Sequence, residues 1–195
     1  MIYTDKYIMI SRDELLEKVA NQMSNHRFQH VLRVEKKALE LARRYHVNLE
    51  QASIAALVHD YAKERDDGEM IKLIKSQDFS KELLEYGNPI WHGIVGAYII
   101  EEELGITDQD ILDAVRLHTT GAANMSELSK LIYVADYIEE GRDFPGVDEA
   151  RKLSEIDLDE AVKFEAYQTL NYLLKRKQRI YPKSIETYNT WVVNN

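Results

Sequence analysis

A histidine and an aspartate stand side by side at His59 and Asp60, directly after the apolar run 55–58. Both residue types are strong metal ligands, and here they fall in a segment whose side chains would ordinarily only pack against a core. The pair alone is a weak motif, because a chain with six histidines can contain one by chance. It gains meaning because the other candidate ligands also lie in segments with helical periodicity.

Four further residues could complete a metal site around this pair. His30 lies in the first turn of a predicted helix, and Asp136 lies in the almost wholly apolar stretch 131–138. A buried carboxylate there must be hydrogen-bonded, paired or bound to a metal, since desolvation of a lone charge is very costly. The candidate metal ligands are His30, His59, Asp60, His92, His118 and Asp136.

The number and type of these ligands indicate the kind of site. Four imidazoles and two carboxylates suit iron, manganese or zinc, whereas magnesium and calcium prefer oxygen ligands alone. Six protein ligands are too many for one catalytic zinc with an open position, but they suffice for two metals if one carboxylate bridges. Asp60 is the natural bridge, because it is next to His59.

Each ligand taken singly also has a simpler explanation. A lone histidine on a helix is more often a hydrogen-bonded structural residue than a ligand, and Asp136 could be a buried cap or half of an ion pair. His26 and His46 are expected at the surface, although His26 is one turn before His30 and could support it. The joint pattern is what favours a metal site.

The elements that must position these ligands are predicted to be helices, because apolar residues recur with helical spacing throughout. The first helix opens with a capping box at 11–14, and Asn88 and Pro89 are expected as cap and first residue of another. Only 2–10 looks weakly strand-like. The sequence predicts one all-α domain, with further helices at 26–45, 49–63, 69–75, 88–104, 108–118, 126–140, 158–177 and from 184.

Composition narrows the class of protein. The chain has 195 residues and no cysteine, which removes disulfides and thiolate ligands and fits a reducing compartment. There is no signal-peptide pattern and no apolar run of roughly 18 residues, so a cytoplasmic protein without a membrane segment is expected. The net charge of −9 argues against a nucleic-acid surface. A small phosphorylated ligand stays possible, because bound cations can invert the local charge.

Several blocks of the sequence resemble a known family. The ordered series of His30, His59-Asp60 and Asp136 resembles the signature of the HD-domain metal-dependent phosphohydrolases, and His92 and His118 resemble additions of the two-metal subclass. Longer blocks resemble the YqeK-type symmetrical diadenosine tetraphosphate hydrolases: 27–30, 57–63, 91–93, 116–121, 135–139 and 141–147. The resemblance covers residues 25–189.

The resemblance implies an all-α HD-domain helical bundle with an extra N-terminal helix and C-terminal helices. Residues 25–195 would form the HD-type domain and residues 1–24 an N-terminal extension. The implied cofactor is a di-iron centre, with manganese and zinc as alternatives. We assign His30, His59, Asp60 and Asp136 to one metal. The second metal takes Asp60, His92 and His118, with positions left for water and phosphate.

The implied activity is hydrolysis of a symmetrical dinucleoside tetraphosphate to two nucleoside diphosphates by a metal-activated water. Asp60 and Lys63 are the expected catalytic residues, with Asp60 as the bridge. Either Asp60 or an acid next to the ligands would carry the proton of the attacking water. Lys63 is expected on the helix face of His59, four residues on. The residues expected to bind substrate phosphates are Arg27, Lys63, Thr119, Thr120, Gly121 and Arg142. The simpler alternatives are solvated surface charges and, for 119–121, an ordinary helix stop.

Two other functions remain open at the level of sequence. The chain could be an HD phosphohydrolase for a nucleoside mono- or triphosphate or a cyclic nucleotide, with the same chemistry and a different pocket. It could also be a nucleotide-binding module without catalysis, although such a module should have lost a ligand. The apolar residues near the N-terminus favour either a homodimer or packing onto the domain itself: Ile2, Tyr3, Tyr7 and Ile8.

Overall fold

The computed structural model describes residues 1–193, and this part of the chain contains helices and no β-strand. The all-α prediction is therefore confirmed. The helices, with η1 a 3₁₀-helix and η2 a π-helical turn, are α1 (Arg12–Ala20), α2 (Asn25–Arg44), α3 (Leu49–Val58), α4 (Asp67–Ser76), η1 (Lys81–Glu85), α5 (Asn88–Leu104), α6 (Gln109–Leu117), α7 (Glu127–Ile138), α8 (Val147–Ile156), α9 (Leu158–Lys175), α10 (Pro182–Tyr188) and η2 (Asn189–Val193).

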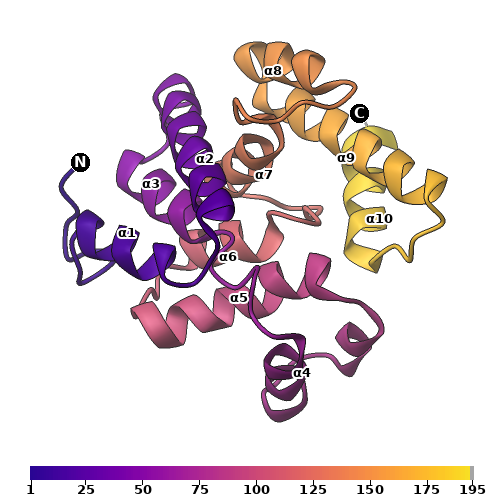
Figure 1. Ribbon diagram of the computed structural model, residues 1–195. Helices are drawn as coiled ribbons and strands as arrows, with labels where there is room; N and C mark the ends of the chain where they lie inside the picture. Colours follow the sequence, from indigo (N-terminus) through magenta and orange to yellow (C-terminus); the bar gives the residue numbers. More distant parts are fainter. Residues whose placement is uncertain (194–195) are drawn as a thin grey trace.

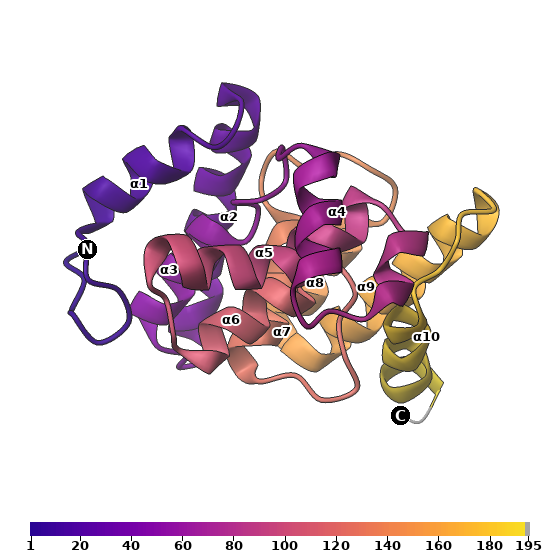
Figure 2. The same cartoon turned by 90° about the horizontal axis from the view of Figure 1, so that it is seen from below.

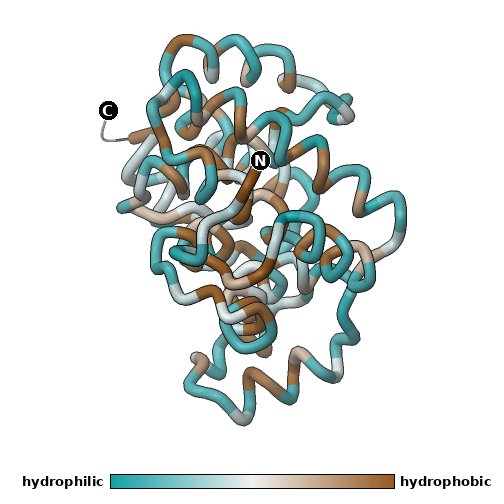
Figure 3. The backbone as a smooth tube through the Cα atoms, turned by 90° about the vertical axis from the view of Figure 1, so that its left-hand side faces the viewer, coloured by the Kyte–Doolittle hydropathy of each residue, from teal (hydrophilic) through white to brown (hydrophobic). Residues whose placement is uncertain are grey.

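The body of the molecule is built from α2, α3, α5, α6 and α7, which pack against one another. The short helix α3 lies within it, and every side chain from Ala52 to Val58 is buried. In Figure 1, α8, α9 and α10 gather on the side away from α1, and α4 projects below α5. Seen from below, α1 and α10 lie at opposite ends (Figure 2). Hydrophilic stretches predominate along the outline of the molecule (Figure 3).

Several helix ends follow the sequence prediction. Ser11 and Glu14 form the expected capping box of α1, and Asp108 caps α6 through its side chain. Gly105 ends α5 with a φ of 67°, a left-handed conformation that favours glycine. The start of α5 differs, because Gly87 is the cap and Asn88 is already helical. Pro89 is therefore the second helical residue, where its missing N–H still costs no helical hydrogen bond.

The prediction that the third helix runs to residue 63 is wrong. Helix α3 ends at Val58, and residues 59–64 form tight turns with Tyr61 N bonded to Val58 O and Lys63 N to Asp60 O. The reason is local. His59 Nδ1 lies 2.7 Å from the carbonyl of Ala56, which is the acceptor that Asp60 N would need in a continued helix.

Helix α8 was missing from the prediction, which left 147–156 unassigned. Its cap, Gly146, has a φ of 97° and provides no side-chain hydrogen bond, so the usual start signal is absent. Its buried face consists of Val147, Ala150 and Ser154, which is too small and polar to stand out as an apolar stripe.

The prediction of a weak strand at 2–10 is also wrong, because this segment contains a turn and bends and no strand. Tyr7 and Ile8 are buried against the chain itself, and the Tyr3 hydroxyl lies 2.7 Å from Ser53 Oγ on α3. Arg12 of α1 forms an ion pair with the buried Glu35 of α2. Of the four apolar residues named in the prediction, Tyr3, Tyr7 and Ile8 thus pack onto the domain, and Ile2 is largely exposed. No helix within residues 1–193 is long and apolar enough to cross a membrane.

The last helices hold the loop that follows α6. Thr187 Oγ1 of α10 donates to the carbonyl of Thr120 at 2.8 Å, and Trp191 Nε1 of η2 donates to the carbonyl of Ala122 at 2.8 Å. Gly121 lies between these contacts with a φ of 62°, and a Cβ there would come within 2.6 Å of Thr187 Cγ2. Glycine is required at this position for both reasons.

Gly121→Ala is expected to destabilise the chain more than Gly105→Ala. Both positions have a positive φ, which costs an alanine about 1–2 kcal/mol. Only Gly121 adds a clash with α10, worth about 1–3 kcal/mol more, because a Cβ at Gly105 meets nothing within 4 Å. Urea denaturation of both variants measures the difference, and equal losses would contradict the close packing of α10 on this loop.

Candidate metal centre

The structure brings all six predicted metal ligands together. They come from five helices or helix ends: His30 from α2, His59 and Asp60 from the turn after α3, His92 from α5, His118 from the end of α6 and Asp136 from α7. Three overlapping groups of these side chains each place their ligand atoms within 4.8 Å of one another. The four imidazoles and Asp60 are buried, and the side chain of Asp136 is 22% exposed.

Asp60 lies between two pairs of imidazoles. Its Oδ2 atom is 3.7 Å from His30 Nε2 and 3.5 Å from His59 Nε2. Its Oδ1 atom is 3.3 Å from His92 Nε2 and 3.7 Å from His118 Nε2. Two ligand atoms that are each about 2.1 Å from one ion lie roughly 3.0–4.2 Å apart, so these separations match ligands of first-row metals.

Asp136 adds a second carboxylate on one side only. Its Oδ1 atom is 3.1 Å from His30 Nε2 and 3.9 Å from His59 Nε2. The side of the centre next to His30 and His59 therefore has two carboxylates within ligand distance, whereas the side next to His92 and His118 has only Asp60.

Backbone carbonyls orient three of the four imidazoles. The Nδ1 atoms of His59, His92 and His118 lie 2.7, 2.6 and 2.7 Å from the carbonyls of Ala56, Asn88 and Val115. A carbonyl only accepts, so Nδ1 carries the hydrogen and Nε2 presents a lone pair to the centre. His30 differs, because its Nδ1 lies 3.1 Å from a carboxylate oxygen of Glu139.

The inward-facing nitrogens fit a bound cation. His30 Nε2 and His59 Nε2 are buried and have no hydrogen-bond partner among the described residues. His92 Nε2 and His118 Nε2 are 3.0 Å apart, and both present lone pairs because their Nδ1 atoms are the donors. Converging lone pairs beside two carboxylates are unfavourable without a positive charge between them, which a divalent metal would supply.

The protonation states are those that metal binding needs. Burial lowers the pKa of His59 and of His92 to about 4, so both imidazoles are neutral at pH 7. Burial alone would raise the pKa of Asp60, but His59, His118 and His92 outweigh it and hold that pKa well below its ordinary value. The pKa of Asp136 is lowered in the same way by His30, His59 and Arg142 against the effect of burial.

Three cationic side chains border the centre. Arg27 Nη1 lies 3.0 Å from Asp60 Oδ2, and Arg142 Nη2 lies 2.5 Å from Asp136 Oδ1. Lys63 Nζ lies 3.3 Å from His92 Nδ1. Lys63 reaches the centre from the turn after α3, so its predicted position on the helix face of His59 is wrong, because the helix has ended.

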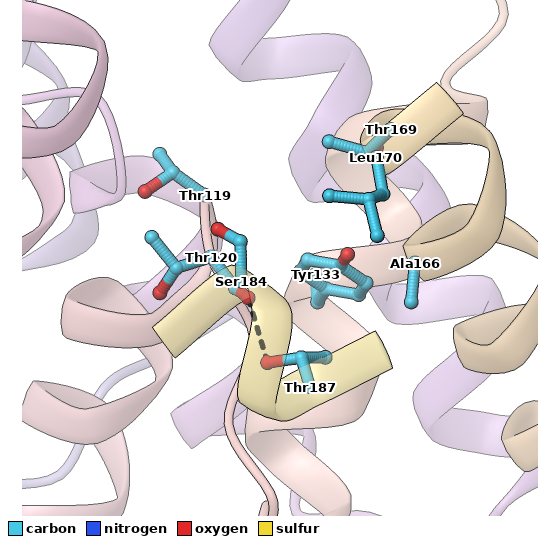
Figure 4. Close-up of a pocket in the computed structure, with 8 residues that line it drawn as sticks. All are labelled: Thr119, Thr120, Tyr133, Ala166, Thr169, Leu170, Ser184 and Thr187. Atoms are coloured by element: carbon cyan, nitrogen blue, oxygen red, sulfur yellow. Dashed lines mark hydrogen bonds between the residues drawn. The ribbon is translucent and has the colours of Figure 1, made fainter. Parts of the chain in front are cut away.

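The segment 119–121 is only partly open to a ligand. Thr120 is buried, its hydroxyl donates to the carbonyl of Gly121, and its own carbonyl accepts from Thr187. Thr119 Oγ1 is buried without a hydrogen-bond partner among the described residues and lines a small pocket. Figure 4 shows Thr119 and Thr120 on one side of this pocket and Tyr133 with α9 residues on the other.

The sequence prediction gave no role to Glu139 or Arg33. Glu139 is buried at the end of α7 and contacts both His30 and Arg33. Arg33 outweighs burial and lowers the pKa of Glu139, with the Gly141 amide and His30 adding to the effect. Spacing gave only a weak signal: Glu139 is three residues after Asp136 and Arg33 three after His30, but this does not show that Glu139 contacts His30. The two remaining histidines, His26 and His46, are exposed as predicted.

Comparison with known proteins gives a consistent result. Residues 27–141 match the HD domain family. The chain is 44% identical over 185 residues to the symmetrical bis(5′-nucleosyl)-tetraphosphatase of Bacillus subtilis, covering 95% of this chain and 99% of that protein. It is 43% identical to the protein of the same name from Halalkalibacterium halodurans, covering 92% of this chain and 96% of that protein.

A solved structure is similar over almost the whole chain. It is the crystal structure of a Clostridium acetobutylicum protein described as a predicted HD superfamily hydrolase involved in NAD metabolism. The TM-score is 0.90 and the sequence identity 34%, and the similarity covers 96% of this chain and all of that one. The helical arrangement described above is thus found in a related protein.

The metal-free protein is expected to lose stability as the pH falls from 7.5 to 5. His59 and His92 have pKa values of about 4 when folded against an ordinary 6.5, so the unfolded chain binds more protons in this range. The loss is about 2 kcal/mol per histidine. Urea denaturation at both pH values checks it. His92→Asn should remove about half of the pH dependence of stability, whereas the control His46→Asn, at an exposed position, should remove little of it. A stability that does not change between the two pH values would contradict the burial argument.

Proposed function

This chain is a member of the HD-domain hydrolases and of the symmetrical bis(5′-nucleosyl)-tetraphosphatase family, and we propose that it hydrolyses diadenosine tetraphosphate to two ADP at a two-metal centre. The proposed ligands are His30, His59, Asp60 and Asp136 for one ion and Asp60, His92 and His118 for the other. The observation that carries this proposal is that the two oxygens of Asp60 face two different pairs of imidazoles.

For this reaction the protein has to hold the metal ions and the polyphosphate in place and to supply positive charge around them. When bound, two metal ions would acidify a water molecule and stabilise charge on the phosphate that is attacked. Water adds to one of the two inner phosphorus atoms, and the bond from that phosphorus to the central bridging oxygen breaks. The products are two molecules of ADP. A diphosphate is already a weak base, so its departure requires no acid from the protein.

The chain's cationic side chains would bind the polyphosphate. Arg27 and Arg142 offer planar guanidinium groups suited to two-point phosphate contacts, whereas Lys63 acts as a point charge beside His92. All three are in contact with the ligand cluster, so they can hold both inner phosphates near Asp60. Thr119 has a hydroxyl without a partner among the described residues and could donate to the same group. Thr120 would help to position the substrate through its carbonyl, which Thr187 of α10 holds, and Gly121 by letting α10 pack closely on this loop.

Iron is the proposed metal, with manganese and zinc as alternatives, because four imidazoles and two carboxylates suit all three. A regulatory module without catalysis is disfavoured because all six ligands are present and converge. The nucleotide is the proposed partner. A cytoplasmic location and a homodimer stay predictions from the sequence.

ADP is expected as the sole nucleotide product from diadenosine tetraphosphate in the presence of iron or manganese. Asp60→Ala should lose both metals and activity together, because it removes the one carboxylate that both positions share. Product chromatography and metal analysis of purified wild type and variant test this. Formation of AMP with ATP, or no turnover by fully metallated wild type, would reject the proposed reaction.

Arg142→Lys is expected to reduce kcat/KM by about 10–100-fold while metal content stays the same. Lysine keeps the positive charge but loses the two-point contact, and one charge-assisted hydrogen bond is worth about 1.5–3 kcal/mol. Steady-state kinetics and metal analysis measure the two effects separately. The exposed Arg176→Lys on the far end of α9 is the control and should behave as wild type. Unchanged kinetics of Arg142→Lys would remove Arg142 from the proposed substrate site.

A further inference from the structure

Glu139 connects a ligand helix to the loop that carries Arg142. It is 1% exposed, at the end of α7. Its Oε1 atom lies 3.1 Å from His30 Nδ1, and its Oε2 atom accepts from Arg33 Nε at 2.7 Å and from the Gly141 amide at 2.5 Å. The carboxylate of this one buried residue at the end of α7 thus contacts both α2 and the turn that follows α7.

The partner of His30 differs in charge from the partners of the other three imidazoles. His59, His92 and His118 donate from Nδ1 to neutral backbone carbonyls. His30 donates to a carboxylate, which pulls on the Nδ1 proton and increases the negative charge on Nε2. Of the four proposed imidazole ligands, His30 is the one whose Nδ1 faces a carboxylate, so its Nε2 is expected to donate most strongly to a bound metal.

The two sides of the centre differ further in their ligands and surroundings. The His30 side has Asp136 in addition to the shared Asp60, and the other side has Asp60 alone. The cation of Lys63 stands beside His92 on that other side. Arg27, Arg33 and Arg142 offset some negative charge on the His30 side, but their side chains are 25%, 29% and 33% exposed and are screened by solvent, whereas that of Glu139 is 2% exposed.

We propose that Glu139 is a positioning residue which strengthens His30 as a ligand and makes the His30 side the higher-affinity metal position. The inference rests on the proposed two-metal centre. It predicts that the two ions bind in two steps of different affinity, and that the tighter step depends on Glu139.

The turn around Glu139 is held independently of its carboxylate. Arg151 of α8 donates to the carbonyls of Ile138, Glu139 and Arg142 at 3.0, 2.9 and 2.8 Å. A substitution at Glu139 should therefore leave the backbone of this turn in place. Glu139→Gln keeps an oxygen that can accept from His30 Nδ1 and removes the charge, so it tests the electrostatic part of the proposal.

The test is a titration of the metal-free full-length protein with Mn²⁺, followed by calorimetry and by the signal of free Mn²⁺. Wild type should bind two ions in two resolved steps, and His92→Asn should lose the weaker one. Glu139→Gln should weaken the tighter step by about 10–100-fold and leave the weaker step within about threefold. Saturating Mn²⁺ should restore two ions per chain, which a purely structural defect would not allow.

Glu140→Gln is the matched control, because Glu140 is the next residue, is exposed and pairs only with Lys36 among the described residues. It should change neither step. If Glu139→Gln unfolds, Glu139→Asp replaces it, since aspartate keeps the charge and withdraws it from His30, and the tighter step should again weaken. An unchanged tighter step, or equal weakening of both steps in a folded variant, would overturn the proposal. Failure of wild type to bind two ions would instead overturn the two-metal centre.

Discussion

The burial of one carboxylate among four imidazoles is the constraint on which this structure depends. Asp60 is 3% exposed, and desolvation of an unpaired charge would cost more than a marginally stable fold can bear. Arg27 offsets part of this cost through its ion pair with Asp60, and a cation bound between the inward-facing imidazole nitrogens would offset more of it. The arrangement of α2, α3, α5, α6 and α7 is the one that lets five separate chain segments reach this place.

The ends of two helices position two of the imidazole ligands. His59 and His118 stand at the residues that terminate α3 and α6, where the last carbonyls of a helix lack backbone donors. Each imidazole satisfies one of these carbonyls through Nδ1 and is fixed in the orientation that leaves Nε2 free. The same hydrogen bond that stops the helix thus selects the tautomer of the ligand. Local secondary structure and the chemistry of the centre are consequences of one contact.

The sequence was sufficient for the fold class, most helices and the convergence of the six ligands, because apolar periodicity marks the helices and polar residues stand out within apolar runs. It was insufficient where a side chain competes with the backbone, as His59 does at the end of α3, and for α8, whose buried face is small and polar. Glu139 stayed without a role because its importance arises from a contact with His30, 109 residues away. Such a partner is set by packing between helices and not by local spacing.

The contacts between the last helices and the loop after His118 have a consequence for how the protein is made. Thr187 and Trp191 fix the carbonyls of Thr120 and Ala122, two and four residues beyond a ligand. On a ribosome, α2 to α7 emerge well before these contacts can form. The ligand loop therefore reaches its final conformation only when residues 182–193 have also left the exit tunnel, so a nascent chain would carry an incompletely fixed centre until then.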